Sequence, residues 1–214
     1  MAGTGTSQPT DLAAAKAALR RDLRAGRRMA SAALGPAAGE ALVPLILEEI
    51  PPPVGAVVGA YWPMPGEIDV RPLLHALADR GLALALPVVV DREGPMVFRG
   101  WAPGDPLEPG PLKTLHPSPS APEVVPDWLL VPLMGFDRRG YRLGMGGGFY
   151  DRTLAALAAE GRLPMTLGVA FSAQEVDELP IEGHDCPLNA VATETGIRRF
   201  SPHPSCAPGS EDPV

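Results

Sequence analysis

A cluster of glycines flanked by arginines is the most distinctive chemical signal in this sequence. Four glycines fall within five positions, namely Gly144, Gly146, Gly147 and Gly148. Arginines stand on both sides of the cluster, namely Arg138, Arg139, Arg142 and Arg152. Glycines leave room for backbone N–H groups to approach a phosphate, and arginines supply the countercharge. The segment therefore predicts a phosphate-binding loop.

The position of the loop in the chain fits the same chemistry. It lies between a predicted strand at 128–134 and a predicted helix at 149–160, where α/β sheets bind ligands and a helix N-terminus attracts anions. The sequence has no GxxxxGK[ST] string, and its glycine order differs from GxGxxG, so neither familiar nucleotide motif is present. Glycines can also form a tight strand-to-helix turn, but such a turn accounts for one or two of them.

A row of basic residues lies near the N-terminus. Lys16, Arg20 and Arg24 follow one another at four-residue intervals in a helix predicted to begin at Asp11. Like charges at this spacing repel by a few tenths of a kcal/mol per pair unless an anion relieves them. The row is therefore either an anion-binding surface or a solvated basic face.

Three acidic residues stand where a site of this kind needs carboxylates. Glu67 follows a predicted strand and a Pro-Gly turn, Asp151 directly follows the glycine cluster, and Asp185 precedes the last predicted strands. Mg²⁺ takes one or two protein carboxylates and completes its shell with phosphates and waters, which suits Asp151 and Asp185. Glu67 can also be a surface acid, Asp151 a first-turn acid of its helix, and Asp185 a turn former.

Composition limits the classes of protein that this chain can be. The net charge of −7 argues against a nucleic-acid-binding surface spread over the whole chain. No apolar run reaches the roughly 18 residues of a membrane span, and the N-terminal residues lack the pattern of a secretory signal. We therefore expect a cytoplasmic chain that binds neither nucleic acid nor membrane, with Cys186 and Cys206 as free thiols.

The order of predicted elements indicates the α/β class. Short apolar strands are predicted at 54–61, 82–90, 96–101, 128–134, 165–171, 190–193 and 196–199. Helices are predicted from 11, at 36–49, at 70–80 and at 149–160. We expect one three-layer domain over 11–200 with a central, mostly parallel sheet, and disordered tails at 1–10 and 201–214. Prolines make 102–126 an irregular loop or a flap.

The string FDRRGYRLGMGGGFYDR at 136–152 closely resembles the signature loop of the 5-formyltetrahydrofolate cyclo-ligases. KAALR at 16–20, YWPMPGEIDV at 61–70 and LPIEGHDCPLNAVATETGI at 179–197 extend the resemblance in the family's order. The resemblance implies a relative of the sugar-phosphate isomerase and CoA-transferase architecture. It also implies an enzyme, expected as a monomer, that uses ATP and Mg²⁺ to close 5-formyltetrahydrofolate to 5,10-methenyltetrahydrofolate.

The resemblance also implies a role for each site residue. Catalysis would fall to Lys16, Arg142 and Tyr150, and the metal ligands would be Asp151 and Asp185. ATP would be bound by Lys16, Arg20, Arg142, Leu143, Gly144, Met145, Gly146, Gly147, Gly148, Phe149, Tyr150 and Asp151. The folate would be bound by Trp62, Met64, Glu67, Met145, Phe149 and Tyr150.

The mechanism that the resemblance implies is phosphorylation of the formyl oxygen, followed by attack of N10 on the activated carbon and loss of phosphate. It demands charge stabilisation and alignment more than a protein nucleophile. One alternative is a paralogue with another small-molecule role, such as one in thiamine metabolism. Another is a non-catalytic module that binds nucleotide, folate or RNA.

Overall fold

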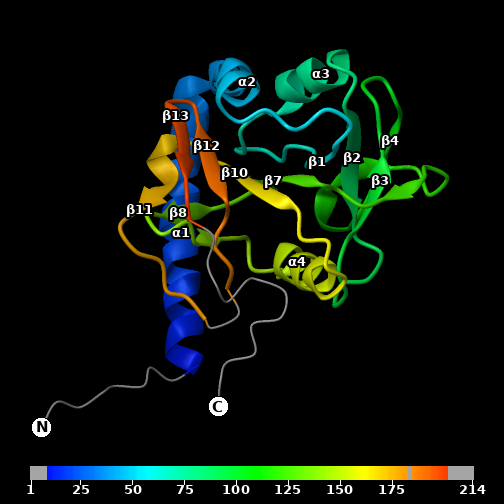
Figure 1. Cartoon of the computed structure of the whole chain (residues 1–214). Coiled ribbons are helices and arrows are strands. Elements are labelled where there is room, and N and C mark those ends of the chain that lie inside the picture. The colour runs from blue at the N-terminus through cyan, green and yellow to red at the C-terminus, as the bar shows by residue number, and fades with distance from the viewer. Residues whose placement is uncertain (1–8, 183–184, 202–214) are drawn as a thin grey trace, which may run out of the picture.

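An eight-stranded sheet forms the centre of the molecule (Figure 1). The computed structural model describes residues 9–182 and 185–201. The sheet has the strand order β13-β12-β10-β7-β1-β2-β3-β6. Its strands are β1 (Val57–Gly59), β2 (Ala83–Val88), β3 (Val97–Gly100), β6 (Glu123–Val124), β7 (Trp128–Pro132), β10 (Met165–Val169), β12 (Ala190–Thr193) and β13 (Gly196–Arg199). The inner strands from β12 to β2 pair in parallel, and β13, β3 and β6 pair antiparallel.

Helices cover both faces of this sheet and give three layers. On one face, α2 (Ala37–Glu49) and α3 (Arg71–Asp79) pack their leucines against Leu130 of β7. On the other face, Leu154 of α4 (Phe149–Ala159) packs near Leu129 and Val131 of the same strand. Successive residues of β7 thus face opposite layers, as the pleat requires. The prediction of an α/β fold with a central, mostly parallel sheet is confirmed.

A long helix, α1 (Pro9–Leu34), runs along the side of the molecule that carries a second, smaller sheet (Figure 1). This sheet has the order β11-β8-β9, with strands β8 (Gly135–Asp137), β9 (Arg142–Leu143) and β11 (Glu175–Val176). Leu23 of α1 packs on Met134, Tyr141 and Leu143 in a separate hydrophobic cluster. The glycine loop therefore follows the β8–β9 hairpin. It does not directly follow β7, although its position in the sequence predicts that it does.

Most predicted elements lie close to the observed ones, and the proline-rich segment differs most. It contains a two-stranded sheet, β4 (Leu107–Pro109) with β5 (Leu115–Pro117), a short 3-10 helix η1 (Pro111–Lys113), and the edge strand β6. The expectation of an irregular loop or a flap was wrong for these short elements, because a proline is tolerated in short edge strands. The helix α1 already begins at Pro9, within the predicted tail, while 1–8 and 202–214 lie outside the described residues.

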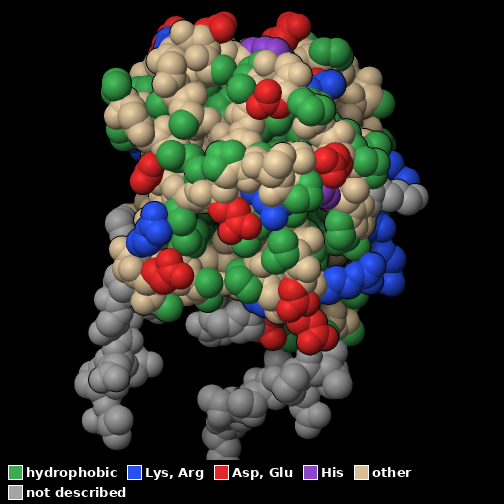
Figure 2. Space-filling model, turned by 90° about the vertical axis from the view of Figure 1, so that its right-hand side faces the viewer, with side chains coloured by type: hydrophobic (Ala, Val, Ile, Leu, Met, Phe, Trp, Pro, Cys, Tyr) green, Lys and Arg blue, Asp and Glu red, His purple; other side chains and the backbone are tan. Residues whose placement is uncertain are grey.

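Charged and apolar side chains are interspersed on the face shown in Figure 2, which is the right-hand side of Figure 1. Within the described part of the chain, no single helix is both long and apolar enough to cross a membrane. Helix α1 from Leu12 and α2, which meet at 90°, pass that test only when taken together.

We predict opposite effects when Ala replaces two helical glycines. A Cβ at Gly39 in α2 would lie 2.1 Å from the backbone oxygen of Asp69, whereas a Cβ at Gly26 in α1 would meet nothing within 4 Å. Gly39→Ala should lower the free energy of unfolding by about 2 kcal/mol, because backbone must move. Gly26→Ala should raise it by about 0.5–1 kcal/mol through helix propensity. Urea unfolding measures both, and a gain for Gly39→Ala would contradict the close approach.

Candidate active site

One face of α1 carries three cations toward the rest of the site. Lys16, Arg20 and Arg27 lie on it, with the buried Leu23 between the second and third. Their spacing of four, three and four residues follows the helical repeat of 3.6. Arg24, predicted to share the row with Lys16 and Arg20, is exposed instead. Because the helix has 3.6 residues per turn, a strict four-residue spacing moves steadily around its axis. Position 27 therefore lies closer than position 24 to the face that carries Lys16 and Arg20.

At the N-terminal end of this face, Lys16 joins α1 to the segment that precedes β12. Its Nζ lies 2.9 Å from Oδ2 of Asp185 and 2.7 Å from Oε2 of Glu182. Burial lowers the pKa of Lys16, but the hydrogen bonds to the two carboxylates outweigh burial and leave that pKa raised. Lys16 is therefore held as a cation beside two carboxylates.

Arg20 contacts the glycine loop directly. Its Nε donates a hydrogen bond of 2.9 Å to the carbonyl oxygen of Gly144. Gly146 and Gly148 have left-handed backbones, with φ of 102° and 65°, and Gly148 is the N-cap of α4. The chain turns into α4 through conformations that side chains disfavour. Gly144 has an ordinary φ and open space where a Cβ would stand, so neither backbone strain nor packing requires a glycine there.

Arg142 connects the start of α4 to the segment around Asp185. Its Nη2 pairs with Oδ1 of Asp151, and its Nη1 donates a hydrogen bond of 3.0 Å to the carbonyl oxygen of Cys186. Its own side chain is 7% exposed. Cys186 is disulfide-bonded in the structure, so the expectation of a free thiol there was wrong; Cys206 lies outside the described residues.

The other arginines near the loop bind different parts of the protein. Arg138 pairs with Glu175 and Asp177. Arg139 pairs with the buried Asp137 and with Glu178. Arg152 donates to the carbonyl oxygens of Gly94 and Arg92 and lies over the ring of Phe149. Within the described part of the chain, Arg142 is the one of these four arginines that forms an ion pair with a predicted site residue, Asp151.

Glu67 is held in a tight turn opposite α1. Its backbone N–H donates to the carbonyl oxygen of Met64 at 2.9 Å, and its Oε2 accepts from the N–H of Met64 at 2.9 Å. Pro65 and Gly66, with φ of 87°, occupy the central positions that a type II turn favours. Burial raises the pKa of Glu67, against the opposing effects of the Met64 N–H and of Arg27. The side chain is 7% exposed.

Tyr150 lies between the two halves of the site. Its hydroxyl is buried and has no hydrogen-bond partner among the described residues. Burial, and then the charge of Glu67, raise its pKa, while Arg142 opposes the shift. A buried hydroxyl without a partner is uncommon in native proteins. The hydroxyl thus lies within electrostatic reach of both Glu67 and Arg142.

Two tryptophans, one of them in the predicted folate site, contact each other at the edge of the core. Trp62 is partly exposed and meets Trp101 edge to face, with ring centroids 5.6 Å apart, and the Arg71 guanidinium lies 5.7 Å from its centroid. Met64 is partly buried. Trp101, which the sequence analysis did not single out, thus fixes the orientation of Trp62.

The remaining predicted residues divide between core and surface. Leu143 is buried in the cluster beneath α1, and Phe149 packs at the edge of the core under α4. Met145 is 49% exposed at the tip of the loop, and Gly147 lies against the ring of Phe149. Any contact of Leu143 with a nucleotide must therefore use its backbone.

Two predicted metal ligands lie on different sides of Arg142. Among the described residues no group of three or more His, Cys, Asp or Glu side chains could hold a metal. Asp151 pairs with Arg142 and Asp185 with Lys16. By chemistry alone, two carboxylates suit Mg²⁺, which takes one or two of them and completes its shell with phosphates and water.

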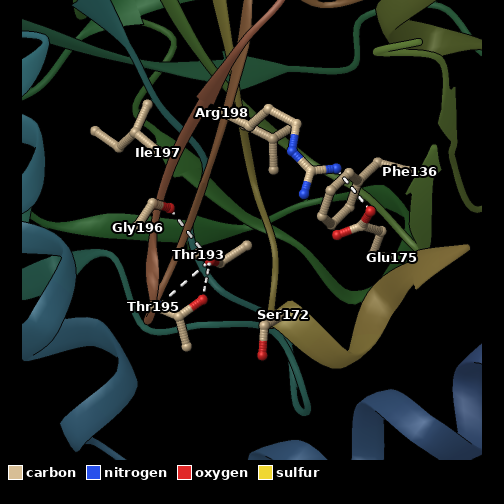
Figure 3. Close-up of a pocket in the computed structure, with 9 residues that line it drawn as sticks. Phe136, Ser172, Glu175, Thr193, Thr195, Gly196, Ile197 and Arg198 are labelled. Atoms are coloured by element: carbon tan, nitrogen blue, oxygen red, sulfur yellow. Dashed lines mark hydrogen bonds and ion pairs between the residues drawn. The ribbon is translucent and has the colours of Figure 1, made fainter. Parts of the chain in front are cut away.

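A separate pocket of about 220 Å³ is lined by residues of β12, β13, β8 and β11 (Figure 3). Its labelled lining includes Ser172, Thr193, Thr195 and Arg198, whose guanidinium pairs with Glu175. None of its lining residues belongs to the predicted site.

Sequence reasoning missed three residues of the site. Arg27 stands beside Glu67, and Glu182 stands beside Lys16. Tyr61 lies near both Glu67 and Tyr150. Arg27 could have been found by continuing the helical face seven residues past Arg20. Glu182 and Tyr61 carry no such signal, because their positions depend on loops.

A mostly parallel sheet, a glycine loop at a helix N-terminus and cations gathered from α1 are typical of α/β proteins that bind phosphates. The chain belongs to the 5-formyltetrahydrofolate cyclo-ligase family, whose model matches residues 12–194. The Escherichia coli K12 5-formyltetrahydrofolate cyclo-ligase is 38% identical over 153 residues, covering 69% of this chain and 83% of that protein. The Mycolicibacterium smegmatis 5-formyltetrahydrofolate cyclo-ligase is 35% identical over 155 residues, covering 65% and 74%.

Solved structures agree with this assignment. The 5,10-methenyltetrahydrofolate synthetase of Aquifex aeolicus superposes with a TM-score of 0.73 at 28% identity, over 88% of this chain and 94% of that one. The synthetase of Mycoplasma pneumoniae, at 23% identity, shares the fold with a TM-score of 0.65 over 84% and 98%.

We predict that two glycines of the loop differ in what they do. Gly148→Ala should lower the free energy of unfolding by about 1–2 kcal/mol, because the left-handed backbone penalises a Cβ. Gly144→Ala should change it by less than about 0.5 kcal/mol but weaken ATP binding at least tenfold, since the added methyl would stand where phosphates approach the backbone. Urea unfolding and calorimetric titration with ATP measure the two effects. Unchanged ATP affinity in Gly144→Ala would contradict a ligand role for this glycine.

Proposed function

We propose that this chain catalyses the ATP-dependent closure of 5-formyltetrahydrofolate to 5,10-methenyltetrahydrofolate, with release of ADP and phosphate. Membership of the family supports the reaction. The observation that carries it is the reach of α1, whose Arg20 contacts the glycine loop while Arg27 contacts Glu67. One rigid helix thus joins a region suited to phosphates to a buried carboxylate suited to a pterin ring.

ATP would be bound by Lys16, Arg20, Arg142 and the loop from Leu143 to Asp151. The cations would neutralise the triphosphate, and backbone N–H groups at the start of α4 would bind its oxygens. Lys16 and Arg142 now pair with carboxylates. Because these pairs hold both cations ready, a triphosphate would meet charges that are already in place.

The folate would lie on the Glu67 side. The pterin ring presents adjacent N–H donors, which a carboxylate can accept together, and Glu67 would bind them. Trp62, Met64, Met145 and the aromatic residues Phe149 and Tyr150 would line this part of the site. The Tyr150 hydroxyl, which lacks a partner among the described residues, would donate to the bound substrate.

In the first step, the formyl oxygen attacks the γ-phosphorus, the bond from that phosphorus to ADP breaks, and a phosphorylated imidate forms. In the second step, N10 attacks the formyl carbon and loses its proton, and the bond from carbon to the phosphate oxygen breaks. Lys16 and Arg142 stabilise the charge on the transferred phosphoryl group, and Tyr150 orients the substrate. Asp151 and Asp185 would hold Mg²⁺, which supplies charge neutralisation at the phosphates when bound.

The same proposal covers the extent of the domain, its architecture, its oligomeric state and its location in the cell. We expect one catalytic domain over 11–200, related to the sugar-phosphate isomerase and CoA-transferase architecture and active as a monomer. Because the reaction consumes ATP and a reduced folate, we place it in the cytoplasm. The net charge of −7 supports small-molecule partners over nucleic acid or membrane lipids.

The reaction can be tested directly. Purified protein is mixed with 5-formyltetrahydrofolate and MgATP, and absorbance is followed at the methenyltetrahydrofolate band, with controls that omit ATP, metal or protein. We expect a rise that requires all components, with one phosphate released per product. A protein that binds ATP without this rise would instead be a paralogue with another substrate or a binding module.

We predict that Lys16→Ala and Asp151→Asn each lower kcat/KM at least about 100-fold, the usual cost of removing one preorganised charge. Both side chains form partly exposed ion pairs, so stability should change by less than about 1 kcal/mol. Asp177→Asn is the control, because the side chain of Asp177 is 96% exposed in its own ion pair. Activity loss that accompanies unfolding would point to structural roles instead.

A further inference from the structure

Arg27 is a buried arginine outside the residues assigned so far to substrate or nucleotide. It is 5% exposed. Its Nη1 lies 3.4 Å from Oε1 of Glu67, and its Nε has no hydrogen-bond partner among the described residues. A buried pair with such loose geometry and an unpaired donor costs desolvation that its attraction repays poorly. Stability alone therefore gives little reason for Arg27 to be an arginine.

The turn beside Arg27 determines how Glu67 is presented. Oε2 of Glu67 already accepts the Met64 N–H at 2.9 Å, and Oε1 faces Arg27. A Cβ at Gly66 would lie 3.9 Å from Nε of Arg27, so the guanidinium extends along the turn. The Met64 N–H thus holds Oε2 in place, and Oε1 is left facing the Arg27 guanidinium.

The charge of Glu67 depends on this arrangement. Burial favours the neutral acid, and the Met64 N–H and Arg27 favour the carboxylate. The other ionisable groups near it are Tyr61, whose hydroxyl donates to the Ile68 carbonyl oxygen at 3.1 Å, and Tyr150; Asp69 lies near Tyr61. Arg28 also lies along this turn, its Cγ 3.9 Å from a Cβ at Gly66, but Arg27 is the cation that lowers the pKa of Glu67.

We propose that Arg27 is a positioning residue that keeps Glu67 ionised and aimed at the substrate, so that its carboxylate accepts the paired N–H donors of a pterin ring. The proposal rests on the proposed function, in which Glu67 binds the pterin. A neutral Glu67 would point its own O–H donor at an N–H donor of the pterin ring, so the folate would bind poorly. Arg27 thus controls folate affinity without touching the folate or the ATP.

The test measures binding of 5-formyltetrahydrofolate without ATP, by calorimetric titration from pH 6 to pH 9. In Arg27→Met the pKa of Glu67 should rise further, so the carboxylate is lost at a higher pH than in the unmodified chain. We expect Kd to rise at pH 7, to rise more at pH 6 toward the roughly tenfold limit that a shift of one pKa unit sets, and to approach the unmodified value at pH 9. ATP affinity should stay within about twofold. Arg27→Lys should restore most of the folate affinity.

Two further variants separate positioning from structure. Arg27→Met in a Glu67→Gln background should add less than about twofold to Kd, because an amide at position 67 cannot titrate, and this double variant leaves no buried charge unpaired. Arg21→Met, at an exposed position of α1, is the control and should match the unmodified chain. A loss that is equal at every pH, or equal in the Glu67→Gln background, would overturn the role of Arg27 alone. Failure of the unmodified chain to bind the folate while it binds ATP would overturn the proposed function and this inference together.

Discussion

The packing of Leu23 between α1 and the small sheet fixes where the cations of the site can lie. Leu23 is buried among Met134, Tyr141 and Leu143, and a Cβ at Gly135 would stand 2.6 Å from its methyl group. Helix α1 therefore sits close to β8 with one face turned inward. Because the helical repeat sets the rest, Arg20 and Arg27 emerge on either side of this contact, one at the glycine loop and one at Glu67.

The small sheet has a second consequence for the site. It inserts a hairpin between β7 and the glycine loop, so the loop is held by β9 and by the start of α4. Asp137 of β8, which is fully buried, accepts the backbone N–H groups of Arg139 and Tyr141 and ties the hairpin turn. The loop thus begins at a strand end that is held in place. Its left-handed glycines then turn the chain from that strand into the N-terminus of α4.

The sequence predicted the layers of this fold better than it predicted the site's framework. Strands such as β7 and β10 are buried on both faces, and continuous apolar runs of that kind are readable from residue type. The strands β8, β9 and β11 are two or three residues long, too short for any periodicity to register. Arg27 lies on the helical face that Lys16 and Arg20 define, but its role depends on a partner forty residues away. The loop position of Glu182 has no local code.

The charges of the site balance within the protein itself. Lys16 pairs with Asp185 and Glu182, Arg142 with Asp151, and Arg27 with Glu67. The first two pairs are partly open to solvent, so their partners can be exchanged at modest cost. The third is buried, and its exchange would leave an unpaired charge in a poorly solvated place. The site can therefore exchange its ion-pair partners where a charged triphosphate would bind, and it keeps a fixed ion pair where a neutral ring would be recognised. A reaction between ATP and a folate requires both properties.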